Sequence, residues 1–256
     1  MKTEKILAMI YQAAEQLPEE ARSAYQYARE KPGLYNVLPD LGATLGALAH
    51  QLEEEATREA AKRCGRTAQY RALERVVKSA ISCQSTRPNT HGSIPARDGA
   101  RAVCDGYRAV RITNPDAKTP RAIPDGVAPL DVDGFFWGLD SRAASYPVSL
   151  PSAAELRVML ETGRQEYRAR TGKPGTKYQA LYMLNAGPFA VYANAQYLLD
   201  MLEALPGAAC AAGRGPYDAL YFTAPDGDGL LLPVNRSRAQ NVPVINQGTN
   251  AGQKTA

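Results

Sequence analysis

The sequence has few of the residues on which most enzymes and metal proteins depend. Among its 256 residues only two are histidines, and its four cysteines are scattered without any Cys-x-x-Cys pair. A zinc site needs clustered thiolates or imidazoles, and a disulfide framework is typical of small secreted chains, so we expect neither. There is also no nucleotide-binding glycine loop, no Ser-His-Asp order and no cluster of carboxylates. We therefore expect a protein that is not an enzyme and has no cofactor or metal.

Long hydrophobic runs are absent as well. No stretch approaches the roughly 18 apolar residues of a membrane-spanning helix, and the first residues lack the apolar core of a signal peptide. The composition, 45% hydrophobic and 22% charged with a net charge of +4, is typical of soluble globular chains. A charge this mild permits contact with nucleic acid but does not argue for it. We expect a cytoplasmic protein without membrane contact.

The N-terminal quarter predicts helices only. Apolar residues recur at helical spacing over 3–17, Pro18 starts a second helix, and Pro32-Gly33 should end it. A third helix is expected from about Asp40 to Arg63. Together these helices predict a hairpin or small bundle over residues 1–65, acting as a scaffold or a dimerisation element.

The middle of the chain changes to mixed helix and strand. A helix is expected over 68–81, followed by strands 100–104 and 107–113 around Asp105-Gly106, a strong hairpin signal. Residues 114–146 are rich in proline and glycine and hold the single tryptophan, which favours an insertion. Its aromatic residues can serve either as a plug over the core or as a binding loop.

The C-terminal part predicts antiparallel strands with packed helices, so the fold class is α+β. Ser152 and Glu155 form a capping box for a helix over 153–170, and Asn194 is a plausible N-cap for a helix over 195–205. The expected strands are 147–150, 178–184, 188–193, 217–224 and 230–234, the last two joined by the turn 225–229. Residues 239–256 are polar and aperiodic, which predicts a disordered tail.

Three segments of this α+β region resemble bacterial DNA sliding clamps, the β subunit of replicative DNA polymerase III. Residues 102–111 (AVCDGYRAVR) resemble the Asp-Gly-His-Arg hairpin of the family, although Tyr107 replaces its histidine. Residues 148–151 (VSLP) resemble the strand that starts a clamp half-domain. Residues 187–234 resemble its closing segment, a Tyr-Leu-Leu-Asp helix followed by strands that end apolar-Pro-apolar. The resemblance implies a clamp-like domain over 66–238, with 114–146 inserted in it.

The resemblance also implies a function. In the family, the hairpin and the last strand form a pocket for short linear motifs of polymerases and repair proteins. In this chain the implied pocket residues are Cys104, Gly106, Tyr107, Arg108, Ala109, Leu231, Leu232, Pro233 and Val234. The implied partner is a replication or repair protein with a clamp-binding motif, as a phage or mobile element would use.

Double-stranded DNA is a second candidate partner, because paired clamp helices present basic residues to phosphates. The residues implied here are Arg71, Arg75, Lys78, Arg157, Arg164 and Arg168. A clamp protomer repeats its domain three times, whereas this chain has room for one such domain or for half-domains fused from two, so a closed ring would require a homo-oligomer.

Other interpretations stay open at this point. The clamp-like domain can be only a scaffold, with residues 1–65 dimerising or inhibiting a host factor. An enzyme with 114–146 as a lid is a more distant alternative. Asp226 and Asp228 fit a turn better than a calcium site, and Cys83 and Cys104 fit small hydrophobic positions better than reactive thiols.

Overall fold

The computed structural model describes residues 12, 32–83, 86–124, 126–136 and 146–246. The chain divides into two compact units, Met1–Cys64 and Gly65–Ala256. In the first unit the structure describes one long helix, α2 (Pro32–Arg63). The helices expected over 3–17 and from Pro18 to Pro32 lie outside the described residues.

Helix α2 begins eight residues earlier than the sequence predicts. Pro32-Gly33, expected to end a helix, instead stands at the start of α2. Proline is tolerated in the first turn because the N–H that it lacks has no intrahelical acceptor there. The expected start at Asp40 was therefore wrong, whereas the end at Arg63 is confirmed.

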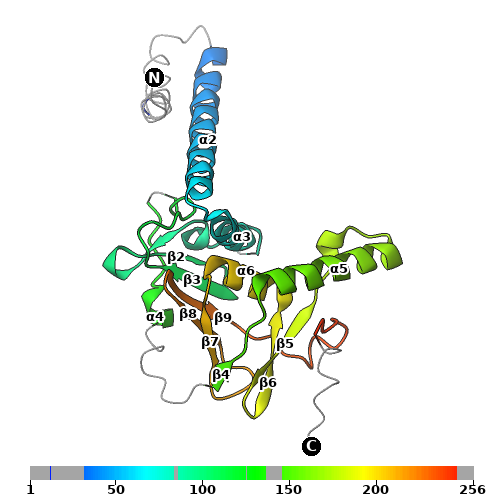
Figure 1. The fold of residues 1–256 in the computed structure, drawn as a ribbon. Helices are drawn as coiled ribbons and strands as arrows, with labels where there is room; N and C mark the ends of the chain where they lie inside the picture. Colours follow the sequence, from blue (N-terminus) through cyan, green and yellow to red (C-terminus); the bar gives the residue numbers. More distant parts are fainter. Residues whose placement is uncertain (1–11, 13–31, 84–85, 125, 137–145, 247–256) are drawn as a thin grey trace, which may run out of the picture. The chain divides into compact units, whose positions relative to one another are not determined.

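The second unit is built on an antiparallel seven-stranded sheet (Figure 1). Its strands, in spatial order, are β1 (Ile94–Pro95), β2 (Arg101–Cys104), β3 (Arg108–Ile112), β9 (Gly227–Leu231), β8 (Leu220–Ala224), β7 (Ala209–Ala212) and β4 (Tyr146–Val148). A separate hairpin pairs β5 (Leu181–Ala186) with β6 (Phe189–Asn194). The α+β class and the antiparallel pairing are confirmed, while β7 was not predicted.

Helices cover the sheet on both faces. The longer ones are α3 (Thr67–Cys83), α5 (Ala153–Thr171) and α6 (Ala195–Ala204), and the short ones are α4 (Asp133–Phe136), η1 (Pro88–Thr90), η2 (Arg97–Gly99) and η3 (Gly175–Lys177). Helices α3 and α6 pack together over one face, whereas α4 lies against the other (Figure 1). The predicted caps are confirmed: Ser152 and Glu155 form a capping box, and Asn194 caps α6.

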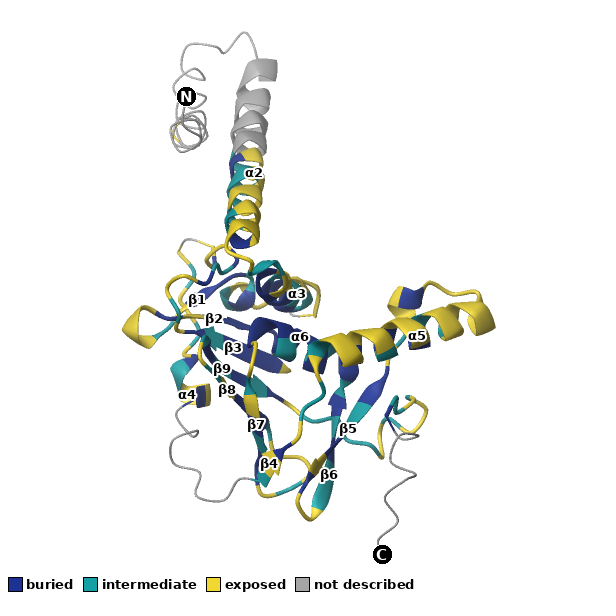
Figure 2. Cartoon of the chain, viewed as in Figure 1, coloured by how far each residue is buried: buried dark blue, intermediate teal, exposed yellow. Residues whose placement is uncertain are grey.

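The two faces of the sheet bury separate apolar clusters. The larger one lies under α3 and α6 and includes Leu73, Val110 and Leu198. The smaller cluster lies on the opposite face, next to α4, which we call the outer face. It joins Cys104 to Phe136 and other apolar residues of the insertion. Figure 2 shows the buried positions concentrated on the strands and on the helix faces that meet them. Phe136 is 2% exposed, so this aromatic residue of the insertion is part of the core.

The last hairpin differs from the prediction by several residues. Ala224 pairs with Gly227, so the turn between β8 and β9 contains only Pro225 and Asp226. Gly227 has a φ of +149°, and a side chain there would collide with the backbone of Arg111. A residue without Cβ can continue the strand through this position, which is why β9 starts earlier than expected and ends at Leu231.

Part of the expected tail is ordered. The N–H of Leu181 donates to the carbonyl of Pro243 at 2.8 Å. The Asn246 side chain accepts from the Met183 N–H at 2.9 Å and donates to the Met183 carbonyl at 2.7 Å. Residues 243–246 therefore pack along β5, and residues 239–242 form local turn contacts with Arg236, contrary to the prediction of disorder from 239 onward.

Candidate functional site

The implied peptide pocket starts at the turn between β2 and β3. Gly106 adopts a φ of +85°, a conformation that favours glycine. The buried Asp105 carboxylate accepts the backbone N–H groups of Tyr107 and Arg108, each at 3.0 Å. A short acidic side chain followed by glycine thus fixes the turn with local hydrogen bonds.

Arg108 lies inside the protein rather than at a pocket rim. Its side chain is 2% exposed, and its Nε donates to the Asp105 carboxylate at 3.0 Å. Its Nη1 donates to the Asp200 carboxylate of α6, and its guanidinium carbon lies 4.1 Å from the centre of the Tyr197 ring. A charge this deeply buried is tolerated because it is paired and hydrogen-bonded. Arg108 anchors the hairpin to α6, which differs from the pocket-lining position that the resemblance implies.

The acidic residues of α6 also bind two of the basic residues that the resemblance assigns to DNA. Asp200 accepts from Arg75 Nε at 2.6 Å, and Glu203 accepts from Arg75 and from Arg157 Nη2, the latter at 2.6 Å. Burial by itself would lower the pKa of Arg75, but the Asp200 and Glu203 carboxylates outweigh it and raise that pKa. Arg75 and Arg157 therefore hold α3 and α5 to α6 and neutralise its acids.

The other four predicted DNA-binding residues do not form one uniform basic face. Arg164 donates to the Gln196 side chain of α6 and lies 3.6 Å from the Glu161 carboxylate. The remaining three are exposed and are Arg71, Lys78 and Arg168. On α3 the Lys78 ammonium lies 3.9 Å from the Glu74 carboxylate. The charge on α3 that is open to phosphates is thus smaller than the sequence indicates.

The hairpin and the last strand, more than 100 residues apart in the sequence, lie side by side. Arg108 of β3 is opposite Leu231 of β9, and the N–H of Leu232 donates to the Tyr107 carbonyl at 2.8 Å. Beyond β9, the N–H of Val234 donates to the Tyr192 carbonyl at 2.7 Å. The structure thus brings together the two segments that contain the implied pocket residues.

Only some of these residues are open to a partner. Tyr107 is 52% and Leu232 is 42% exposed, and both are large apolar side chains. Gly106 is exposed, while Pro233 and Val234 are half-buried. We refer to these five residues as the Tyr107–Leu232 surface. The other apolar members are buried and are Cys104, Ala109 and Leu231.

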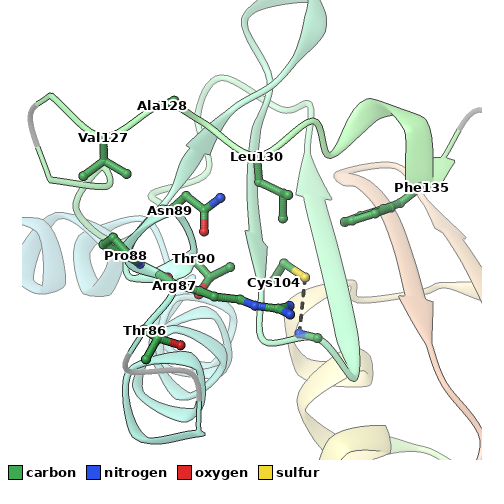
Figure 3. A pocket seen from close by; sticks show the side chains of 11 residues that line it. Thr86, Arg87, Pro88, Asn89, Thr90, Cys104, Val127, Ala128, Leu130 and Phe135 are labelled. Atoms are coloured by element: carbon green, nitrogen blue, oxygen red, sulfur yellow. Dashed lines mark hydrogen bonds between the residues drawn. The ribbon is translucent and has the colours of Figure 1, made fainter.

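A hollow of about 520 Å³ adjoins the same turn on the outer face of the sheet (Figure 3). The walls of the hollow are residues 86–90, Cys104, Gly106, Val127, Ala128, Leu130 and Phe135. Leu130 and Phe135 face the strand that carries Cys104 (Figure 3). The Gly106 N–H donates a hydrogen bond to the Cys104 sulfur at 3.4 Å. The insertion therefore covers part of the outer face and leaves this hollow beside the turn.

Of the two cysteines expected at small buried positions, Cys104 is buried, whereas Cys83 is exposed, so that expectation was wrong for Cys83. Neither Cys104 nor the aspartates Asp226 and Asp228 point to reaction chemistry. Burial raises the pKa of the Cys104 thiol, so it stays protonated at neutral pH. Asp226 receives hydrogen bonds from Arg66, Gln69 and Asn114, which outweigh its burial and lower its pKa. Asp228 pairs with Arg111 at 2.7 Å. These carboxylates bind protein donors, and the described residues include no group of three or more metal ligands.

Three features of this region were not predicted from the sequence. They are the buried ion pair of Arg108 with Asp200, the hollow on the outer face, and the contribution of residues 86–90 to its wall. The one available signal was in α6, where apolar residues extend almost all round the helix. Asp200 and Glu203 lie among them and are 1% and 8% exposed. A helix that is apolar all round is buried, and its acids then require basic partners.

Comparison with protein-family models, with curated proteins and with solved structures found no match for this chain. None of the helices that the structure describes is long and apolar enough to cross a membrane. The features of this chain that bear on its function are therefore the geometry of the Tyr107–Leu232 surface and the two segments that form it, 102–111 and 187–234.

Proposed function

We propose that this chain is a non-catalytic, sliding-clamp-like protein that captures an extended peptide of a replication or repair partner at the Tyr107–Leu232 surface. The observation that carries the proposal is the hydrogen bond of 2.8 Å from the Leu232 N–H to the Tyr107 carbonyl. It joins the two segments whose sequences resemble the clamp motifs. Neither segment alone would suffice, because Asp-Gly hairpins and leucine-rich strands are common.

The chemistry of the surface suits an apolar anchor residue of a peptide. Tyr107 and Leu232 expose large side chains on a backbone that is fixed by the buried Arg108 ion pairs. A pre-organised apolar surface binds with less loss of conformational entropy than a loop that must order. The hollow beside Gly106, about 520 Å³ in volume and bounded by Leu130 and Phe135, offers a place for a second anchor side chain.

Peptide binding tests the proposal. We expect Leu232→Asp and Tyr107→Ala each to weaken binding of a fluorescein-labelled peptide with Leu and Phe anchors at least about tenfold, because loss of a central interface anchor costs about 2 kcal/mol or more. Fluorescence polarisation measures the affinity. The matched control is Val158→Asp on α5, which places the same charge at an apolar position that is 66% exposed.

The control variant should bind like the parent chain, and circular dichroism should show all three variants folded. Unchanged peptide affinity in both Leu232→Asp and Tyr107→Ala would reject the proposal. An equal loss in Val158→Asp would reject it as well, because the effect would then come from added charge and not from the Tyr107–Leu232 surface.

A further inference from the structure

Basic residues gather at the C-terminal end of α5 and in the loop that follows it. Between Arg164 and Lys177 the chain has five basic residues and one acidic residue, Glu166. The exposed basic side chains of this stretch are Arg168, Arg170, Lys173 and Lys177. The distal half of α5 is largely exposed (Figure 2), unlike α3 and α6, whose inner faces are buried. This part of the surface, which we call the α5 basic end, has most of the exposed positive charge of the helix.

Three glycines let the loop lie close to the helix. Gly172 ends α5 in the left-handed conformation, with a φ of +66°. A Cβ on Gly163 would collide with the Tyr178 ring, so the bare backbone there lets the tyrosine lie flat against α5. A Cβ on Gly175 would lie 3.3 Å from Arg164 Cβ, so the loop approaches the helix closely. The basic residues of the loop therefore lie close to those of the helix.

A hollow with aromatic walls lies within the α5 basic end. Its volume is about 560 Å³, and its walls include Tyr167, Tyr178, Arg170 and Pro243, together with Glu166. The two tyrosine rings are 5.9 Å apart and inclined at 50°. Burial, with a further contribution from Glu166, raises the pKa of Tyr178 above its ordinary value, which already leaves a phenol neutral near pH 7.

We propose that the α5 basic end binds single-stranded nucleic acid, with the phosphate backbone on Arg168, Arg170, Lys173 and Lys177 and an unpaired base stacked on Tyr167 and Tyr178. Basic residues that follow the backbone beside aromatic rings that receive bases are the usual means of binding single strands. A duplex keeps its bases stacked inside, so it would use the charges but not the hollow. The inference is independent of peptide capture, and failure of the peptide assay leaves it untouched.

The experiment is fluorescence anisotropy of a labelled oligothymidylate, about 16 nucleotides long, with the full chain at low salt. Arg168→Glu with Lys173→Glu should weaken binding at least about tenfold. The matched control is Arg101→Glu with Arg121→Glu, which reverses two exposed charges on β2 and in the insertion. This control should change the affinity less than about threefold, since charges remote from the bound strand act only through a screened field.

A second pair of variants isolates the stacking. Tyr167→Leu should weaken oligothymidylate binding about tenfold, whereas Tyr167→Phe, which keeps the ring, should bind like the parent chain. A duplex of equal length should bind more weakly than the single strand. Three results would overturn the inference: no binding of the oligothymidylate at low salt, equal loss in the α5 charge variant and in the Arg101→Glu, Arg121→Glu control, or single-strand affinity unaffected by Tyr167→Leu.

Discussion

Arg108 shows how one residue can have a different role from the one that its motif implies. In the sequence it follows Asp105-Gly106-Tyr107, at the position of a basic residue in the clamp hairpin. In the structure it is 2% exposed and paired with Asp105 and Asp200. Its partner on α6 is 92 residues away, and no local pattern specifies such a pair. The side chain that reaches solvent at this turn is its neighbour, Tyr107.

Removal of Arg108 should therefore affect stability more than a surface change does. Arg108→Ala leaves the buried carboxylates of Asp105 and Asp200 without their shared cation, which we expect to destabilise the fold by about 3–5 kcal/mol. Urea unfolding measures this free energy. Arg71→Ala, at an exposed position of α3, should stay within about 0.5 kcal/mol of the parent chain. A loss below about 1 kcal/mol for Arg108→Ala would show that the buried pairs are not structural.

At the scale of elements, the sequence predicted what is decided locally. The starts of α5 and α6 follow from Ser152, Glu155 and Asn194, because N-caps act within one helical turn. The hairpin of β2 and β3 follows from Asp105-Gly106 in the same way. The early start of β9 at Gly227 could not be predicted, since it depends on the close approach of a strand that is distant in the sequence.

The contacts between elements could not be predicted from the sequence pattern either. The candidate surface requires β3 to pair with β9, and periodicity does not reveal which strands pair. The resemblance to clamps implied that neighbourhood, and the register of Arg108 with Leu231 is consistent with it. The sequence offered the aromatic residues of the insertion as a plug over the core, and the buried Phe136 confirms this interpretation. The sequence did not show that the plug covers Cys104 and Ala109, because residues 114–146 have no regular period.

Gly227 tests whether the β8–β9 hairpin is as tightly constrained as the structure indicates. Gly227→Ala places a methyl group against the Arg111 backbone at a φ of +149°, so we expect a loss of at least about 2 kcal/mol in the free energy of unfolding. Thermal and urea unfolding measure it. Gly215→Ala is the matched control, because nothing lies within 4 Å of its added Cβ. Equal stability of the two variants would contradict the described register.

For the whole molecule, the division of the chain after Cys64 indicates which unit binds the peptide. Both apolar clusters lie within Gly65–Ala256. We therefore expect a chain that begins at Gly65 to unfold cooperatively and to retain peptide binding within about threefold of the full chain. Calorimetry and fluorescence polarisation measure the two properties.

The opposite result would favour the alternative reading of the molecule. If the chain from Gly65 folds but binds no peptide, and the biological effect is lost with residues 1–64, then the N-terminal unit carries the function. The α+β unit would then be a scaffold for a structural or regulatory protein. A chain from Gly65 that fails to fold would contradict the division into two units.

The central claim is that a peptide binds at the Tyr107–Leu232 surface, and a methyl NMR titration tests it most directly. The chain is labelled at leucine and valine methyl groups, and the peptide with Leu and Phe anchors is added stepwise. We predict that the resonances of Leu232 and Val234 shift in proportion to the bound fraction, whereas those of Val158 on α5 stay in place. Binding that shifts Val158 or other distant methyls and leaves Leu232 and Val234 unchanged would contradict the account.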